Sequence, residues 1–154
     1  MELGDLITPE AVIPNLAARY KKQVLQELAD RAAELTQLNA SDIFETLLQR
    51  ERLGSTAVGR GIAIPHAQIA GIPRIVSVFA RLQPAIDFDA PDDESVDLVF
   101  LLLAPEHAGA DHLKALARVS RLLRQPQTIE MLRAANDRAT LYAILTEPTA
   151  VQAA

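Results

Sequence analysis

Residues 96–103, VDLVFLLL, carry the strongest structural signal in the chain, because seven of these eight residues are apolar. Acidic residues come before the run and Pro105 follows it closely. A short apolar run with such borders is typical of a β-strand that is buried on both faces. A strand of this kind needs helices or another layer over each face of its sheet. The stretch therefore predicts a fold with a covered sheet.

The segments before this strand also favour extended structure. Residues 54–73, GSTAVGRGIAIPHAQIAGIP, hold three glycines and then Pro65 within twelve residues, which a helix would not tolerate. We expect short strands and tight turns there. Residues 74–82, RIVSVFARL, have apolar side chains on both alternating registers, which predicts a second strand buried on both faces.

Both ends of the chain are predicted to be helical. The N-terminal side has helical patterns over 17–37 and 43–51, with Asn39 or Ser41 as the cap of the second helix and Gly54 as its end. On the C-terminal side, one helix is expected from an N-cap at Asp111, with an apolar face made by Leu113, Leu116, Val119, Leu122 and Leu123. Pro126 is expected to break it, and helices over 128–135 and 138–146 follow, the last capped by Asp137. This order predicts an α/β (α+β) domain, with a central mixed sheet and helices on its faces.

Composition excludes several classes of protein. The 154 residues fit one domain over 1–154, and 49% of them are apolar. Because cysteine is absent, disulfides, iron–sulfur clusters and thiol catalysis are excluded. A net charge of −5 and an aromatic content of 4% argue against nucleic-acid binding. With no apolar run of membrane-spanning length and no signal-peptide pattern, we expect a cytoplasmic protein without membrane insertion.

Two loops resemble ligand motifs without matching them. Residues 54–61 resemble a phosphate-binding Walker loop, but Arg60 replaces the required Lys and Gly61 replaces the Ser or Thr. The segment Asp87–Asp97 starts like a calcium loop but lacks its glycine. Its six acidic residues form either a solvated loop or a contact surface for a basic partner.

The three histidines, His66, His107 and His112, are the remaining candidates for chemistry. Their spacing does not match a helical zinc motif, although a zinc site that uses all three stays open. Pro65 favours an extended backbone just before His66, which should hold that ring stiffly. Arg50 ends the preceding helix, and His112 is expected in the first turn of another helix. A neutral imidazole, a guanidinium and a helix N-terminus would together suit a phosphoryl group, but His66 as an ordinary turn residue also stays open.

A family resemblance joins these residues. The segments 50–56, RERLGST, and 59–66, GRGIAIPH, resemble the signature of the fructose/mannitol-type EIIA domains of the sugar phosphotransferase system, and within it the nitrogen-related EIIA proteins. Residues 96–105 and 112–117 also resemble that group. The likeness covers about residues 3–147. The histidine motif with Arg50 sixteen residues earlier and His112 forty-six residues later is specific to it.

The resemblance implies a site and a donor. His66 would be phosphorylated on Nε2, with Arg50 and His112 stabilising the phosphoryl group. The phosphoryl group would come from phosphoenolpyruvate through an Enzyme I-type protein and an HPr-type phosphocarrier. The fold would be a mixed sheet of about five strands between helices. No cofactor or metal is expected, and His107 would be a loop residue. Because the carrier must dock over the site, an apolar rim is expected, with Ile62 and Ile69 as candidates.

The resemblance also implies a regulatory role, in which targets are bound according to phosphorylation state. Potassium transport or sensor kinase components are the targets it suggests, and transfer of phosphate to a separate sugar-specific EIIB is the alternative. We expect a monomer or a weak dimer. The sequence departs from the common pattern at Ala57, Ala67 and Gln68, where many members have glycine, glycine and a basic residue.

Overall fold

Strand β6 (Val96–Ala104), which contains the 96–103 stretch, lies in the middle of a six-stranded mixed sheet in the computed structural model, which describes residues 2–147. The strand order is β1-β5-β6-β3-β2, with β4 also paired to β6. β5 (Val76–Ile86) runs antiparallel to β6, while β3 and β4 run parallel to it. β1 (Val12–Leu16) pairs in parallel with β5, and β2 (Ala57–Gly59) closes the other edge. The predicted mixed sheet is therefore confirmed.

The count of six strands instead of about five reflects a single interruption. β3 (Ile62–Ala63) and β4 (His66–Gln68) pair in succession with β6, and Pro65 lies between them. Proline has no N–H to donate to a ladder. Its carbonyl still accepts a hydrogen bond of 2.9 Å from the Leu102 N–H, so the two short strands stay aligned. His66 thus follows directly after the break.

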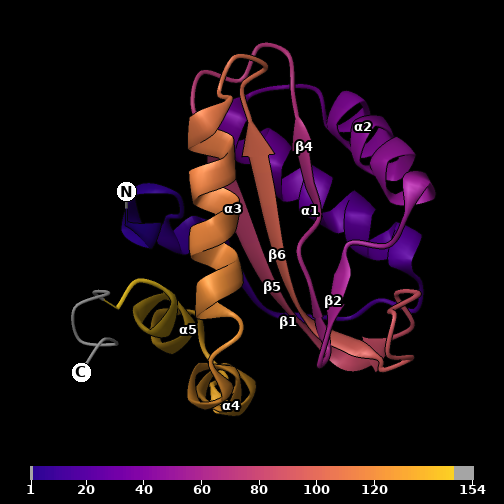
Figure 1. Ribbon diagram of the computed structural model, residues 1–154, viewed down its shortest axis with the longest axis vertical. Coiled ribbons are helices and arrows are strands. Elements are labelled where there is room, and N and C mark those ends of the chain that lie inside the picture. Colours follow the sequence, from indigo (N-terminus) through magenta and orange to yellow (C-terminus); the bar gives the residue numbers. More distant parts are fainter. Residues whose placement is uncertain (1, 148–154) are drawn as a thin grey trace.

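Helices cover both faces of the sheet (Figure 1). α3 crosses in front of β6, whereas α1 lies behind the strands, and α2 packs beside β4. Two short 3-10 turns precede β1. The helical elements are Leu3–Asp5 and Pro9–Ala11 (3-10 turns), α1 (Lys21–Thr36), α2 (Ala40–Leu53), α3 (Ala110–Leu122), α4 (Pro126–Ala134) and α5 (Arg138–Leu145).

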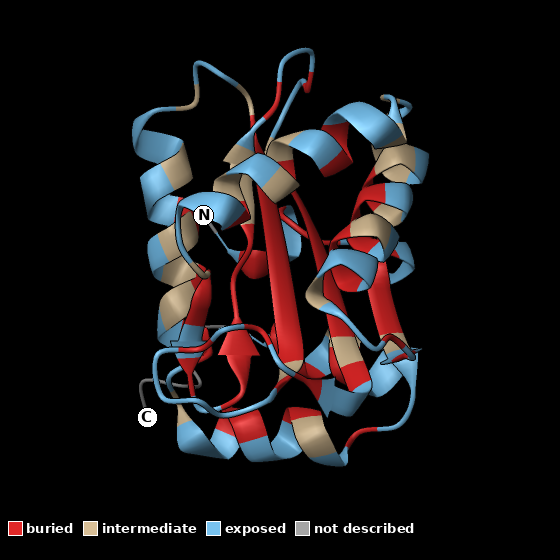
Figure 2. Cartoon of the chain, turned by 90° about the vertical axis from the view of Figure 1, so that its right-hand side faces the viewer, coloured by how far each residue is buried: buried red, intermediate tan, exposed pale blue. Residues whose placement is uncertain are grey.

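The core follows the predicted pattern along the two long strands. Figure 2 shows the strands buried along most of their length, with the helices buried only on their inner sides. All the residues of β6 except Asp97 are buried, and so is the run from Val76 to Ala80 in β5. Strand residues that are buried on both faces require a layer on each side, which explains the helix–sheet–helix arrangement.

β1 is the element that the sequence pattern misses. Pro14 and Asn15 lie inside this strand, and in the sequence they indicate a turn or loop. Proline is tolerated in an edge strand, where one side of the backbone needs no ladder partner. The pairing with β5 shifts register between Ile13 and Leu16, on either side of these residues. The predicted helix 17–37 accordingly begins later, at Lys21.

Two further boundaries differ from expectation. Asp111 is not the N-cap of α3, because the helix begins one residue earlier and Gly109 occupies the cap position without a side-chain bond. Pro126 does not break α3, which has already ended at Leu122, but takes the first position of α4, where its missing N–H costs nothing. The caps at Asn39 and Asp137 are confirmed, since each side chain accepts a backbone N–H.

Within residues 2–147, we find no helix whose length and apolar character would let it cross a bilayer.

Candidate functional site

His66 is held by its own backbone. Its Nδ1 lies 2.8 Å from the Ile64 carbonyl oxygen. A carbonyl can only accept a hydrogen bond, so Nδ1 must carry the proton in this contact. In the neutral ring, Nε2 then keeps the free lone pair. The ring is half-buried at the start of β4. This geometry leaves one defined nitrogen available as a nucleophile.

The ring of His112 contacts the ring of His66. It lies in the first turn of α3, and its ring centroid is 6.0 Å from that of His66 in an edge-to-face arrangement. Its Nε2 is buried and has no hydrogen-bond partner among the described residues. Burial lowers the pKa of His112 below its ordinary value, and the neighbouring His66 lowers it further. His112 is therefore a ring that favours the neutral form and has one unused nitrogen.

Arg50 lies in the last turn of α2, the helix that packs beside β4. Its guanidinium donates a 3.0 Å hydrogen bond to the Gly54 carbonyl, just after the helix ends. The described part of the chain contains no hydrogen bond from Arg50 to His66 or His112. The structure thus brings the two rings together and places Arg50 on an adjoining element, anchored to the loop that leads into the site.

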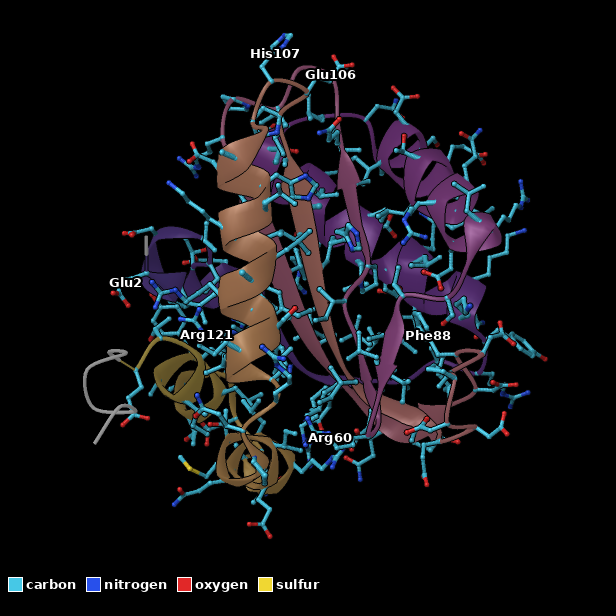
Figure 3. All side chains as sticks on the ribbon, in the orientation of Figure 1. Glu2, Arg60, Phe88, Glu106, His107 and Arg121 are labelled. Atoms are coloured by element: carbon cyan, nitrogen blue, oxygen red, sulfur yellow. The ribbon has the colours of Figure 1, made fainter. Side chains whose placement is uncertain are left out.

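His107 lies apart from this pair. It is exposed in the loop before α3 and points outward at the upper end of the molecule, whereas Arg60 lies at the lower end (Figure 3). Between residues 2 and 147, no three His, Asp or Glu side chains gather closely enough to hold a metal ion. The alternative of a zinc site that uses all three histidines is therefore wrong for the described residues.

Several acidic residues of the Asp87–Asp97 segment have partners within the protein. Asp89 pairs with Lys21 at 2.9 Å, and Asp92 accepts the Arg60 backbone N–H at 2.9 Å. These contacts tie the segment to α1 and to the turn between β2 and β3. They favour a structural role for the segment over a free surface for a basic partner.

Asp97 also belongs to this internal network. Its carboxylate receives the Arg133 guanidinium through both Nε and Nη2. The pair links β6 to α4. Arg133 also donates a hydrogen bond to the carbonyl of Arg60, which lies in the turn between β2 and β3.

Glu51 is the residue that sequence reasoning missed. Its carboxylate is buried and accepts hydrogen bonds from the Thr56 N–H, the Thr56 hydroxyl and the Lys21 ammonium. A signal for it was present in the sequence. Glu51 continues the helical stripe of Ile43 and Leu47, four residues further along at each step, so it lies on the buried face of α2. A carboxylate on such a face needs partners, because burying an unpaired charge is costly.

The apolar rim also differs from expectation. Ile62 and Ile69, the predicted rim residues, are buried and belong to the core. Leu113 is 70% exposed, although the sequence placed it on the apolar face of its helix. The buried stripe of α3 is Ala115, Val119 and Leu122, which leaves Leu113 to one side, next to His112 in sequence. Leu53, at the end of α2, is 85% exposed.

Comparisons with known proteins agree on one family. The family described as "Phosphoenolpyruvate-dependent sugar phosphotransferase system, EIIA 2" matches residues 5–147. A "Nitrogen regulatory protein" of Bradyrhizobium diazoefficiens is 55% identical over 153 residues, covering 99% of this chain and 100% of that protein. A "PTS system fructose-specific EIIA component" of Haloferax volcanii is 36% identical, covering 96% and 98% of the two chains.

The fold comparison points the same way. The crystal structure of nitrogen regulatory protein IIA-Ntr from Neisseria meningitidis is similar with a TM-score of 0.89 and 33% sequence identity. The match covers 94% of this chain and 99% of that one.

Proposed function

This chain belongs to the EIIA 2 family of the phosphoenolpyruvate-dependent sugar phosphotransferase system, among relatives named nitrogen regulatory proteins, and we propose that it accepts a phosphoryl group on His66 Nε2. The donor is an HPr-type phosphocarrier, charged from phosphoenolpyruvate by an Enzyme I-type protein. The proposal places the protein in the cytoplasm, with its donor proteins. The observation that supports it best is the bond from His66 Nδ1 to the Ile64 carbonyl, which leaves Nε2 as the free nitrogen.

The transfer itself exchanges one P–N bond for another. The Nε2 lone pair attacks the phosphorus of the donor phosphohistidine, and the donor P–N bond breaks with its electron pair returning to the donor ring. His66 keeps its Nδ1 proton, so its ring becomes cationic as the new bond forms. The Ile64 carbonyl then accepts a charge-assisted hydrogen bond, which is stronger than the neutral one it replaces. No proton has to leave His66 during the step.

His112 and Arg50 are proposed to stabilise the phosphoryl oxygens. His112 has a buried Nε2 without a partner beside the His66 ring, so a phosphoryl oxygen could supply one. Arg50 has a guanidinium whose remaining N–H groups suit the oxygens of a phosphoryl group. Because the enzyme-like work lies in positioning and charge stabilisation, no cofactor is needed in this scheme.

The first test is phosphorylation with phosphoenolpyruvate, an Enzyme I-type protein and an HPr-type carrier, read by intact mass. We expect one acid-labile phosphoryl group on the wild type and on His107→Ala, and none on His66→Ala. His107 is the matched control, because it is an exposed histidine outside the pair. Phosphorylation of His66→Ala, or none on the wild type, would refute the assignment.

The role of Arg50 is tested separately by the transfer rate. Arg50→Ala should slow transfer by about 100-fold, as the loss of one charge-stabilising donor does in other active sites. Arg52→Ala is the control, since Arg52 is an exposed arginine in the same turn of α2. Equal rates for the two variants would remove Arg50 from the mechanism.

We further propose that phosphorylation regulates target proteins. Adding a charged phosphoryl group beside a docking surface can create or weaken an interface. The exposed side chains of Leu53 and Leu113 lie on α2 and α3, the helices that carry Arg50 and His112, and would form part of that surface. Potassium transport and sensor kinase components are the classes of target to examine first.

A second function is favoured by one relative. The fructose-specific EIIA component of Haloferax volcanii spans nearly the same length as this chain, so a relative of this length is named for a fructose system. Incubation of the phosphorylated protein with isolated sugar-specific EIIB domains separates the two functions. Rapid loss of the phosphoryl group to one EIIB would support the transport role, whereas retention with all of them supports the regulatory role.

A further inference from the structure

Glu51 organises the loop that leads into the site. Its side chain is only 4% exposed and lies on the inner face of α2. Oε2 accepts the Thr56 N–H at 2.9 Å, and Oε1 accepts the Thr56 hydroxyl at 2.6 Å. Lys21 supplies the opposite charge at 3.1 Å. Both hydrogen-bond donors of Thr56 are thus held by one buried carboxylate.

Thr56 in turn fixes Ile64, the residue whose carbonyl holds His66. Its carbonyl accepts the Ile64 N–H at 3.0 Å. The Ile64 carbonyl, in turn, holds His66 Nδ1 at 2.8 Å. Pro65 follows Ile64, and its fixed φ limits the movement of the intervening backbone. A succession of short contacts therefore runs from Glu51 through Thr56 and Ile64 to the His66 ring.

We propose that Glu51 is a positioning residue, which acts through Thr56 to fix the Ile64 carbonyl and thereby selects the Nδ1–H tautomer of His66. This inference rests on the proposed function, because only a phosphoryl acceptor at Nε2 requires that tautomer. An unconstrained neutral imidazole populates both tautomers. If the carbonyl moved away from Nδ1, part of the population would carry the proton on Nε2 and could not attack phosphorus.

The carboxylate is suited to this task because it only accepts hydrogen bonds. Its two oxygens match the two donors of Thr56, and either oxygen can accept from either donor. An amide in its place has one acceptor oxygen, so one of the two Thr56 donors would lose its partner. The loss of one buried hydrogen bond at Thr56 would let the Ile64 carbonyl move away from His66 Nδ1.

The test compares Thr56→Val, which removes the hydroxyl at nearly constant shape, with Thr56→Ser, which keeps it. Thr128→Val is the matched control, because Thr128 is a buried threonine in α4 whose hydroxyl also bonds a side chain, that of Gln125. Glu51→Gln is the second variant at the carboxylate. The tautomer of His66 is read from the imidazole ¹⁵N chemical shifts, with unfolding in urea measured alongside. The rate of phosphorylation is read with phosphoramidate, a small donor that needs no docking.

We expect Thr56→Val and Glu51→Gln to raise the Nε2–H population of His66 and to slow phosphorylation by about tenfold, the factor that corresponds to one weakened hydrogen bond. Thr56→Ser and Thr128→Val should match the wild type in both readouts. Unchanged ¹⁵N shifts in Thr56→Val and Glu51→Gln would overturn the proposal, and so would an equal change in Thr128→Val. The nitrogen spectra need no phosphoryl transfer. The positioning role therefore stands or falls independently of whether the wild type accepts phosphate.

Discussion

Phosphorylation of His66 should raise the pKa of His112. In the unmodified protein, burial and the neighbouring His66 ring hold that pKa below its ordinary value of 6.5. A phosphoryl group on His66 brings negative charge next to the ring and offers an acceptor to its buried Nε2. Both effects favour the protonated form of His112, so the direction of the change is fixed by the geometry.

The magnitude follows from the separation of the two rings. One unit of negative charge at about the 6.0 Å ring separation contributes about 3 kcal/mol at an effective dielectric constant of 20. The same charge contributes about 0.7 kcal/mol in bulk water. With 1.36 kcal/mol for each tenfold change, the acid dissociation constant of His112 should fall by between about 3-fold and about 100-fold. The half-buried position of the ring places it between these limits.

The measurement is an NMR titration of the histidine ring signals with and without the phosphoryl group. Phosphoenolpyruvate and the two donor proteins maintain the modified state during the titration. His107 is the internal control, because it is exposed on a loop outside the pair. A pKa of His112 that stays constant or falls on phosphorylation would refute the reasoning, and an equal change in the ring signals of His107 would show that the effect is not local.

Three further outcomes are expected. Because the pKa of His112 is lowered in the folded chain, its stabilising contribution is complete above pH 6.5 and is lost as the pH falls towards the lowered value. The free energy of unfolding in urea should fall over this pH range, and His112→Gln should reduce that pH dependence. Asp97→Asn should lower the free energy of unfolding by about 1–2 kcal/mol, because it weakens the two-pronged contact with Arg133, while phosphorylation stays unchanged. Asp137→Ala removes the cap bond to the Thr140 N–H and should cost about 1 kcal/mol in thermal or urea unfolding, again with unchanged phosphorylation.

The long elements were predictable because each carries a signal that does not depend on its neighbours. Strand β6 is an apolar run of limited length, and α2 has a capping Asn39 before a helical stripe. β1 has no such signal, since Pro14 interrupts it and pairing with β5 supplies its stability. The start of α3 was misplaced by two residues because Asp111 has the side chain of a typical cap, while Gly109 occupies the cap position instead. Local sequence preferences therefore failed at β1 and at the start of α3, where the rest of the fold decides the conformation.

The candidate site, too, was predictable only in part. Individual candidates could be chosen by residue type, and the sequence pointed to His66 and His112. Their approach to 6.0 Å depends on β4 and α3 both meeting β6, which no local pattern encodes. Glu51 was missed for the opposite reason: its stripe position was visible, but its partner Thr56 lies in a glycine-bordered loop without regular periodicity. The stripe alone could have identified a buried acid, although not what it holds.

The rings of His66 and His112 have different surroundings, and this difference favours His66 over His112 as the proposed phosphoryl acceptor. His66 has Nδ1 satisfied by a carbonyl, so its other nitrogen is the one left free for the proposed transfer. His112 has its Nε2 buried, where a donor protein cannot reach it, and its lowered pKa favours the neutral ring in the unmodified protein. In the proposed transfer, a cationic His112 at rest would repel the cationic ring that forms on His66. After transfer, the new negative charge attracts the proton that His112 lacked. A reversed assignment, with His112 as acceptor, would need a buried nitrogen to attack and would leave the free Nε2 of His66 unused.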